Sequence, residues 1–162
     1  MEIRATRPED LPNLRELYDR ARAFMIARGN PTQWAPGHPT EETIRRDMAA
    51  GGHFVCLEGG EIVGTFAFLL GDDPTYQTIE GAWHWDGVPY GTIHRLASSG
   101  KVPGVARACF NFCAGRMDHL RVDTHADNRP MQDAIRRYGF LECGIIYAPD
   151  GTPRTAFDKR IG

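Results

Sequence analysis

Two strand-like segments separated by a pair of glycines constrain the fold of this chain more than any other feature. Phe54–Glu58 and Glu61–Leu70 are rich in apolar, β-branched and aromatic residues, and Gly59-Gly60 lies between them. Because glycine readily adopts the positive φ angles of a tight two-residue turn, the two segments are predicted to pair as an antiparallel hairpin. A chain with this hairpin must build a β-sheet.

A strand, a glycine-bearing loop, a helix and another strand follow the hairpin. Tyr90–Ala97 and Leu120–Thr124 read as strands, and the apolar residues of 105–113 recur at helical spacing after the loop Ser98–Gly104. Two strands joined through a helix are expected to lie parallel, with a right-handed crossover. The hairpin and this unit together predict a sheet of mixed direction.

The remaining elements extend the sheet and add helices. Thr6-Arg7-Pro8-Glu9 resembles a capping box before a helix that ends at Gly29-Asn30, and Glu80–Asp86 fits either a short strand or a loop. The predicted order is β-α-α-β-β-β-α-β-α-β-β. It describes an α/β (α+β) fold with a mixed, mostly antiparallel sheet of six to seven strands and helices on both faces.

Length, charge and cysteine content narrow the class of protein. The 162 residues fit a single domain spanning residues 1–162, and the net charge of −2 gives no reason to expect a nucleic-acid partner. The start of the chain lacks an apolar run, and no apolar stretch is long enough to span a bilayer, so we expect no signal peptide and no membrane partner. The four cysteines form no CxxC pair, so we expect a reduced, cytoplasmic protein without a metal site.

The segment Ser98–Ala106 is the most informative for function. It joins the end of a predicted strand to the start of a predicted helix, where unpaired backbone N–H groups favour phosphate. Lys101 can add a positive charge, and Gly104 and Ala106 are small enough for a phosphate to approach the backbone. Neither a Walker A loop nor a GxGxxG loop is present, and a simple tight turn is the alternative interpretation.

The pattern Lys101-x-x-Gly104-x-Ala106 resembles the pyrophosphate loop of the GNAT superfamily of acetyl-CoA-dependent N-acetyltransferases. The preceding strand His94-Arg95-Leu96-Ala97 and the later stretch from Asn128 to Gly139-Phe140 are also similar to GNAT motifs, and the order of elements fits over nearly the whole chain. The resemblance implies an acyl-CoA N-acyltransferase fold and acetyl transfer from acetyl-CoA to a primary amine. The amine would be carried by a small molecule or a peptide.

The resemblance also implies which residues hold acetyl-CoA. The strand end would pair with the pantetheine arm, the loop and helix start would hold the pyrophosphate, and an asparagine would bond the arm from the other side. These residues are Leu96, Ala97, Ser98, Lys101, Val102, Gly104, Val105, Ala106 and Asn128.

The catalytic groups are less well defined. Many GNAT members carry a tyrosine midway along the later helix to protonate the leaving thiolate, but Ile135 occupies that position and Tyr138 lies one turn further on. His94 is the best candidate for the general base, because it lies on the predicted cofactor strand and its usual pKa suits the task. Glu80 and Asp123 are weaker candidates, and a partly buried structural histidine is the alternative for His94.

Four aromatic residues lie in segments that border the acceptor pocket in the resembling family: Trp34, Trp83, Trp85 and Tyr90. They can form an aromatic wall for an amine, or instead anchor loops or a homodimer interface. No cysteine has a clear nucleophile setting, so direct attack in a ternary complex is expected. A catalytically weak or inactive CoA-binding or protein-interaction module of the same fold is the alternative.

Overall fold

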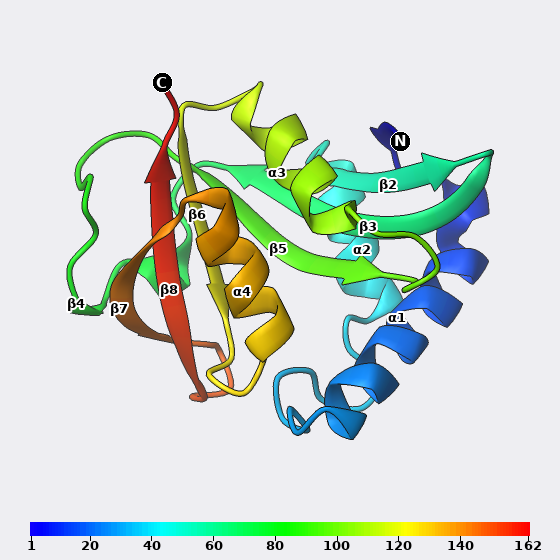
Figure 1. Cartoon of the computed structure of the whole chain (residues 1–162), viewed down its shortest axis with the longest axis horizontal. Coiled ribbons are helices and arrows are strands. Elements are labelled where there is room, and N and C mark those ends of the chain that lie inside the picture. The colour runs from blue at the N-terminus through cyan, green and yellow to red at the C-terminus, as the bar shows by residue number, and fades with distance from the viewer.

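The computed structural model describes residues 1–162 and contains one eight-stranded sheet with the strand order β1-β2-β3-β5-β6-β8-β7-β4 (Figure 1). The strands are β1 (Glu2–Ala5), β2 (His53–Glu58), β3 (Glu61–Leu70), β4 (Glu80–Gly81), β5 (Gly91–Ser98), β6 (His119–Thr124), β7 (Leu141–Tyr147) and β8 (Pro153–Arg160).

The pairing of the strands confirms the mixed, mostly antiparallel sheet. Only β5 and β6 run parallel, and they are joined through α3 as the crossover unit predicts. The β2–β3 hairpin turns at Gly59 and Gly60, whose φ angles of 58° and 82° are both positive. The eighth strand is the two-residue β4. It forms in the segment Glu80–Asp86, for which the sequence fits either a short strand or a loop.

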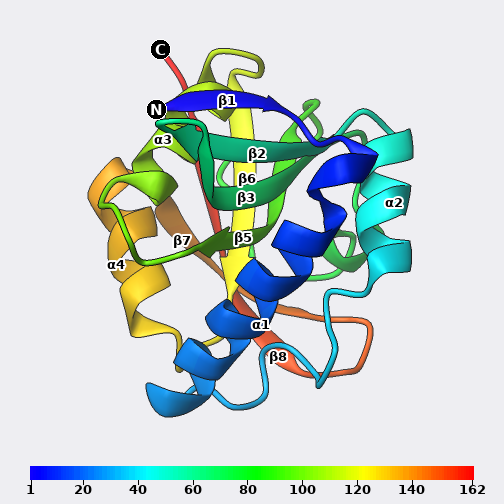
Figure 2. The ribbon, with the colours of Figure 1, turned by 90° about the vertical axis from the view of Figure 1, so that its right-hand side faces the viewer.

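Four helices cover the two faces of the sheet. Figure 2 shows α1 and α2 on one face and α3 and α4 on the other. The helices are α1 (Leu11–Ala27), α2 (Glu41–Ala49), α3 (Val105–Ala114) and α4 (Arg129–Tyr138), with 3-10 turns at Pro8–Asp10 and Pro74–Tyr76. None of these helices is both long and apolar enough to cross a membrane.

Each face of the sheet buries its own apolar cluster, because alternate strand residues point to opposite faces. On one face, Leu14 and Tyr18 of α1 pack with Val55 of β2. On the other face, Phe110 of α3 and Ile135 of α4 pack against the sheet and are fully buried. A third cluster lies under the long segment between β3 and β5.

The capping prediction at the start of α1 is wrong in detail. Asp10 rather than Glu9 supplies the carboxylate, and it accepts a hydrogen bond of 2.8 Å from the backbone N–H of Arg7. Thr6 does not cap the helix, because its hydroxyl lies 2.7 Å from Nδ1 of the buried His53. The Thr6 side chain, which the local pattern assigns to the helix cap, therefore bonds to a residue of β2 instead.

Strand β5 changes direction halfway along its length. Its register with β3 shifts opposite Thr65 and Ala67, and Arg95 adopts a φ of 54°, which is unusual for a residue with a side chain. Strand β5 pairs with β6 only over Gly91–Ile93, so the two strands diverge from His94 onward (Figure 1). The second half of β5 therefore has no partner strand on its β6 side.

Gly64 allows the start of α3 to pack closely on β3. A Cβ atom at this position would lie 2.4 Å from Cγ1 of Val105 and 3.2 Å from the carbonyl oxygen of Ala97. Because the β-branched Val105 side chain is stiff, we expect Gly64→Ala to lower the free energy of unfolding by about 1–3 kcal/mol. Urea denaturation of the purified variant measures this change.

Gly115→Ala is the matched control for Gly64→Ala. Gly115 has a φ of −76°, and an added Cβ would meet no atom closer than 3.6 Å. We expect a change within about 0.5 kcal/mol in this variant. Equal stabilities of the two variants would contradict the close packing of α3 on β3.

Candidate active site

A cleft of about 630 Å³ opens on the face of the sheet that carries α1 and α2. The α1–α2 loop and α2 form one side, and strands β3, β5, β6 and β8 form its floor and far wall. His94 and Arg95 line it at the point where β5 leaves β6. The cleft has the size of a small-molecule site.

His94 lies between two carboxylates in this cleft. Its Nε2 is 2.7 Å from Oδ2 of Asp73, and its Nδ1 is 3.9 Å from Oδ2 of Asp123. The same oxygen of Asp123 accepts a hydrogen bond of 2.6 Å from the hydroxyl of Tyr76. The ring is therefore held in one orientation, with its Nδ1 side facing Asp123 across a short gap.

Asp73 remains ionised at neutral pH. Burial would raise the pKa of its carboxyl group, but the hydrogen bond and charge of His94, together with two bonds from Thr75, lower this pKa to about 2. A charged Asp73 accepts the hydrogen bond from Nε2–H of His94. In the neutral ring this leaves Nδ1 without a proton, so Nδ1 can accept one.

The loop before α3 leaves several backbone amides unbonded. The N–H groups of Val102, Gly104, Val105 and Ala106 donate no hydrogen bond within the chain, and Gly104 caps the helix with a φ of 88° and no side-chain bond. Lys101 does not point freely at these amides, because its Nζ lies 2.6 Å from a carboxylate oxygen of Glu61. The structure therefore has a row of free donors at the start of α3, and phosphate binding there stays a prediction.

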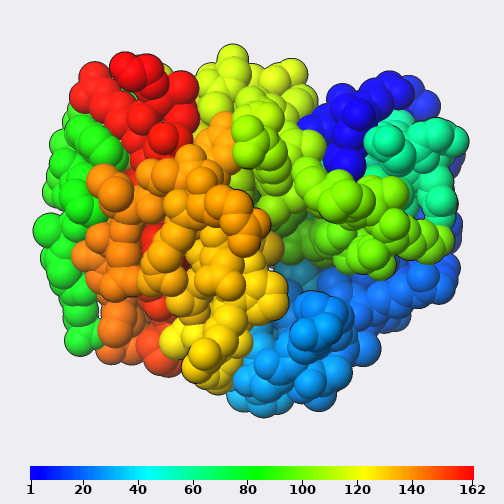
Figure 3. Space-filling view, in the orientation of Figure 1, coloured from blue at the N-terminus to red at the C-terminus, as the bar shows by residue number.

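This row of donors lies beside the diverging strands. In the space-filling view the surface is hollowed where the yellow-green loop before α3, the yellow N-terminal part of α4 and the blue end of α1 meet (Figure 3). The predicted cofactor residues Leu96, Ala97 and Ser98 belong to the half of β5 that has no β6 partner. The predicted cofactor residues on β5 and α3 are thus brought together.

The side chain of Asn128 already forms hydrogen bonds within the chain. Its Oδ1 accepts a hydrogen bond from the backbone N–H of Met131 and caps α4, and its Nδ2 lies 3.1 Å from Oε1 of Gln33. Gln33, in the α1–α2 loop, also accepts bonds from Thr124 and from the backbone of His125. The role of Asn128 in cofactor binding remains a prediction, while its capping role is evident.

Tyr138 lies away from His94. Its hydroxyl donates a hydrogen bond of 2.7 Å to Asn111 of α3, and its ring packs against Phe110 and Phe140. It is not among the residues that line the cleft, and Ile135 is fully buried in the core. The structure does not bring the two predicted catalytic side chains together, so Tyr138 as general acid stays a prediction.

Of the four predicted acceptor-binding aromatics, only Trp34 lines the cleft, where its ring stands edge-on to Tyr18. Trp83 and Tyr90 are buried, and Cζ of Arg121 lies 4.0 and 3.8 Å from their ring centres. Trp85 packs on His119 instead. Trp83 and Tyr90 anchor the segment between β3 and β5, because the buried Arg121 cation on β6 attracts their faces.

Sequence reasoning missed three cleft residues. Asp73 follows β3 in a segment that reads as an ordinary turn, although it carries the side chain closest to His94. Asp47 of α2 holds Arg95 through two hydrogen bonds of 2.8 Å. Arg154 of β8 lines the far wall. The one available signal for Arg154 is that an ionisable residue interrupts an otherwise apolar strand. No local pattern indicated Asp73 or Asp47.

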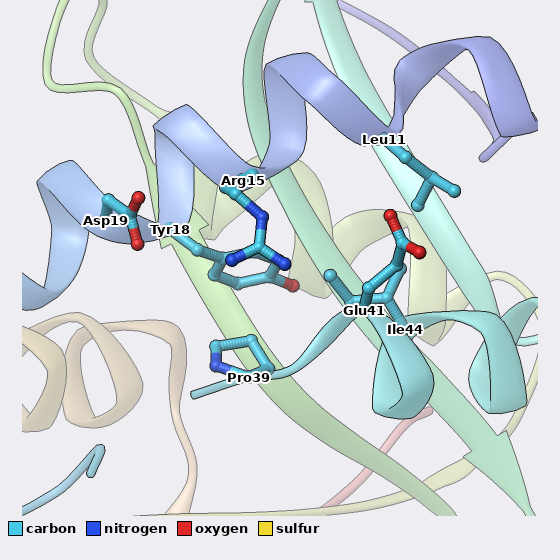
Figure 4. A pocket seen from close by; sticks show the side chains of 7 residues that line it. All are labelled: Leu11, Arg15, Tyr18, Asp19, Pro39, Glu41 and Ile44. Carbon is cyan, nitrogen blue, oxygen red and sulfur yellow. The ribbon is translucent and has the colours of Figure 1, made fainter. Parts of the chain in front are cut away.

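Two further clusters lie outside the cleft. A pocket of about 10 Å³ lies between α1 and α2 and has room for about one water molecule (Figure 4). Near β4, Nδ1 of His84, Sγ of Cys143 and an oxygen of Asp158 lie within 4.8 Å of one another. The sequence predicts no metal site, yet these are atoms that Zn²⁺ can bind. Within the chain, His84 is hydrogen-bonded to Asp158 and lies 3.3 Å from Sγ of Cys143.

No protein-family model and no curated protein matches the sequence. Solved structures do match. A GNAT-family acetyltransferase from Streptococcus agalactiae superimposes with a TM-score of 0.90 at 29% identity, over 99% of this chain and 95% of that one. The chain has the fold of the GNAT acyltransferases. This similarity supports an acyltransferase in general.

Other proteins with the GNAT fold are more distant. A putative acetyltransferase from Staphylococcus aureus has a TM-score of 0.74 at 23% identity, with both chains fully covered. GphF, a GNAT-like decarboxylase in complex with isobutyryl-CoA, has a TM-score of 0.69 at 16% identity, over 99% of each chain. At these identities the comparisons show the GNAT fold alone.

Proposed function

We propose that this chain transfers an acetyl group from acetyl-CoA to a primary amine by direct attack in a ternary complex. One observation carries the proposal: the free edge of β5 beyond Ile93 lies next to the unbonded amides at the start of α3. An extended amide-bearing arm can pair with the strand edge, and its diphosphate can accept hydrogen bonds at the helix N-terminus. GphF, a GNAT-like decarboxylase with the same fold, is in complex with isobutyryl-CoA, which supports an acyl-CoA as the donor.

His94 is proposed to remove the proton from the attacking amine. The amine nitrogen would lie in the cleft near Nδ1, which faces Asp123, and its proton would pass to Nδ1 as the nitrogen bonds to the thioester carbon. The imidazolium that forms is stabilised by Asp73 on its other side. The carbon–sulfur bond then breaks, and CoA leaves as the thiolate.

Stabilising the oxyanion and releasing the thiolate would require few further groups from the chain. A backbone N–H on the free side of β5, among Leu96, Ala97 and Ser98, would donate to the developing oxyanion. A thiol with an ordinary pKa near 8.5 can leave as a thiolate without a dedicated acid. Tyr138 as the proton donor therefore remains a prediction that the mechanism does not require.

Direct attack is favoured because the cysteines are poor nucleophiles. Cys56, Cys109 and Cys113 are buried, and none of the four cysteines lines the cleft. Burial raises the pKa of the Cys56 thiol to about 12, and burial with the nearby Asp158 raises that of Cys143 to about 12. A protonated thiol cannot form an acyl-enzyme efficiently.

A thermal-shift titration with acetyl-CoA tests the proposal first. A ligand that binds only the folded protein raises its Tm with concentration, so acetyl-CoA should raise it while ATP and NAD should not. A panel of amines is then screened by release of free CoA thiol. Binding without turnover of any amine would favour the CoA-binding module, and no shift at millimolar acetyl-CoA would exclude the proposed donor.

Charge reversals at the two ends of α3 test whether the cofactor binds at the N-terminus of this helix. Arg107 is exposed in the first turn of α3, and Arg116 follows its last turn. Arg107→Glu places a carboxylate beside the free amides and should weaken acetyl-CoA binding by about tenfold. Arg116→Glu makes the same charge change at the other end and should leave the Kd unchanged. Equal effects would contradict a site at the helix N-terminus.

A further inference from the structure

Arg154 is a nearly buried cation in the wall of the cleft that contains His94. It lies near the start of β8, paired with Ile146 of β7, and only 7% of its surface is exposed. Its Nη2 donates a hydrogen bond of 2.9 Å to the backbone carbonyl of Gln33 in the α1–α2 loop. This bond fixes the guanidinium against the cleft without neutralising its charge.

The chain supplies no directly bonded counter-charge to this guanidinium. Asp150 feels the charge of Arg154, but the pKa of its carboxyl is lowered mainly by hydrogen bonds from Thr152. Arg154 forms no ion pair; its Nε is buried without a partner, and its Nη1 donates no hydrogen bond within the chain. The four aspartates that line the cleft already have other partners, namely Arg95 for Asp47, His94 for Asp73, Tyr76 for Asp123 and Thr152 for Asp150.

Arg121 shows that the chain can accommodate a buried guanidinium in another way. Its Nε also lacks a hydrogen-bond partner, but the faces of Trp83 and Tyr90 enclose its guanidinium and its Nη2 bonds the carbonyl of Trp85. Arg154 has no aromatic ring over its guanidinium. Neither a direct ion pair nor an aromatic face therefore compensates its charge, and it lines the cleft where a ligand can reach it.

We propose that Arg154 binds a carboxylate of the acceptor, so that the substrate carries both an amine and a carboxylate. A buried charge is costly unless it is paired, and the planar guanidinium donates two parallel hydrogen bonds to a carboxylate. That the acceptor carries an amine rests on the proposed function, whereas the carboxylate site at Arg154 does not depend on it. Amino acids and peptides with a free carboxylate within reach of the amine have this chemistry.

Binding of matched acids and amides tests the site without requiring turnover. The probes are N-acetylated amino carboxylic acids with one to four carbons between nitrogen and carboxylate, each beside its primary amide, titrated by calorimetry. At the spacing that fits, the acid should bind the wild-type protein roughly tenfold to a hundredfold more tightly than its amide. Equal affinities of acid and amide at every spacing would overturn the proposal.

Variants assign the preference to Arg154. Arg154→Gln should abolish the difference between acid and amide, and Arg154→Lys should keep part of it, because the charge remains and the paired donors are lost. Arg46→Gln is the matched control, since Arg46 lines the same cleft on α2 but is exposed; it should keep the full preference. If Arg154→Gln fails to fold, Arg154→Lys still tests the proposal. An undiminished preference for acid over amide in Arg154→Lys would show that the guanidinium does not bind the carboxylate.

The same probes separate this proposal from the proposed function. A protein that binds acetyl-CoA and acetylates amines and amino acids equally well is an acetyltransferase without the carboxylate site. A protein that prefers acids through Arg154 but gives no thermal shift with acetyl-CoA has the carboxylate site and a different activity.

Discussion

Replacing His94 with glutamine should lower kcat by about a hundredfold or more and leave the Kd for acetyl-CoA unchanged. General-base catalysis by a positioned side chain contributes about this much to a rate. Glutamine keeps the size and the hydrogen bonding of the side chain but cannot take a proton at neutral pH. The measurement is steady-state release of CoA thiol with a saturating amine, together with calorimetric binding of acetyl-CoA.

The geometry explains why this effect should be confined to turnover. His94 is the first residue of β5 without a β6 partner, and it lines the cleft, where Asp73 and Asp123 flank its ring. The free strand edge and the amides of α3 that would hold the cofactor come after it in the chain. The substitution would therefore remove the proposed base and keep the proposed cofactor site.

A second histidine of the same cleft is the matched control. His38 lines the cleft on the α1–α2 loop and has no carboxylate partner. His38→Gln should retain most of the wild-type kcat. If His94→Gln and His38→Gln behaved alike, or if His94→Gln lost acetyl-CoA affinity in proportion to turnover, His94 would be a structural residue and not the base.

The free energy of unfolding should fall by about 3 kcal/mol as the pH decreases from about 6.5 to about 4, through His53 alone. His53 is 1% exposed, and its ring nitrogens lie 2.7 Å from Oγ1 of Thr6 and 3.2 Å from the hydroxyl of Tyr18. Burial, with a smaller contribution from Arg95, lowers the pKa of His53 from 6.5 to about 4.

The direction of this dependence follows from proton binding. The unfolded chain takes up a proton on His53 near pH 6.5, whereas the folded protein takes it up only near pH 4. Between these values the unfolded state binds more protons, so acid favours unfolding. Above pH 6.5 both states leave the ring neutral, and this contribution to the pH dependence disappears.

Urea denaturation at several pH values between 7.5 and 4 measures the effect. The comparison is with His53→Gln, which has a polar side chain that does not titrate, so its curve should be flatter by about 3 kcal/mol over this window. Carboxylates titrate in both proteins, and the difference between the curves cancels them. Parallel curves for the two proteins would show that His53 is protonated in the folded state at an ordinary pH.

Much of the fold could be predicted because its determinants are local. Gly59-Gly60 turns the β2–β3 hairpin, and the strand–loop–helix–strand unit forms the single parallel pair, β5 with β6. The prediction was wrong where a tertiary partner competed for a side chain. Thr6 bonds to His53 instead of capping a helix.

The sequence by itself determined the elements, their order and the loop–helix junction at Gly104, because turns, caps and apolar periodicity depend on residues a few positions apart. It also predicted His94 as the candidate base. Only the tertiary structure decided what surrounds His94, because those partners come from distant parts of the chain. Asp73 lies 21 residues before it, and Arg154 bonds to Gln33 across 121 residues. Such contacts depend on how strands and loops pack in space, and no local pattern encodes them.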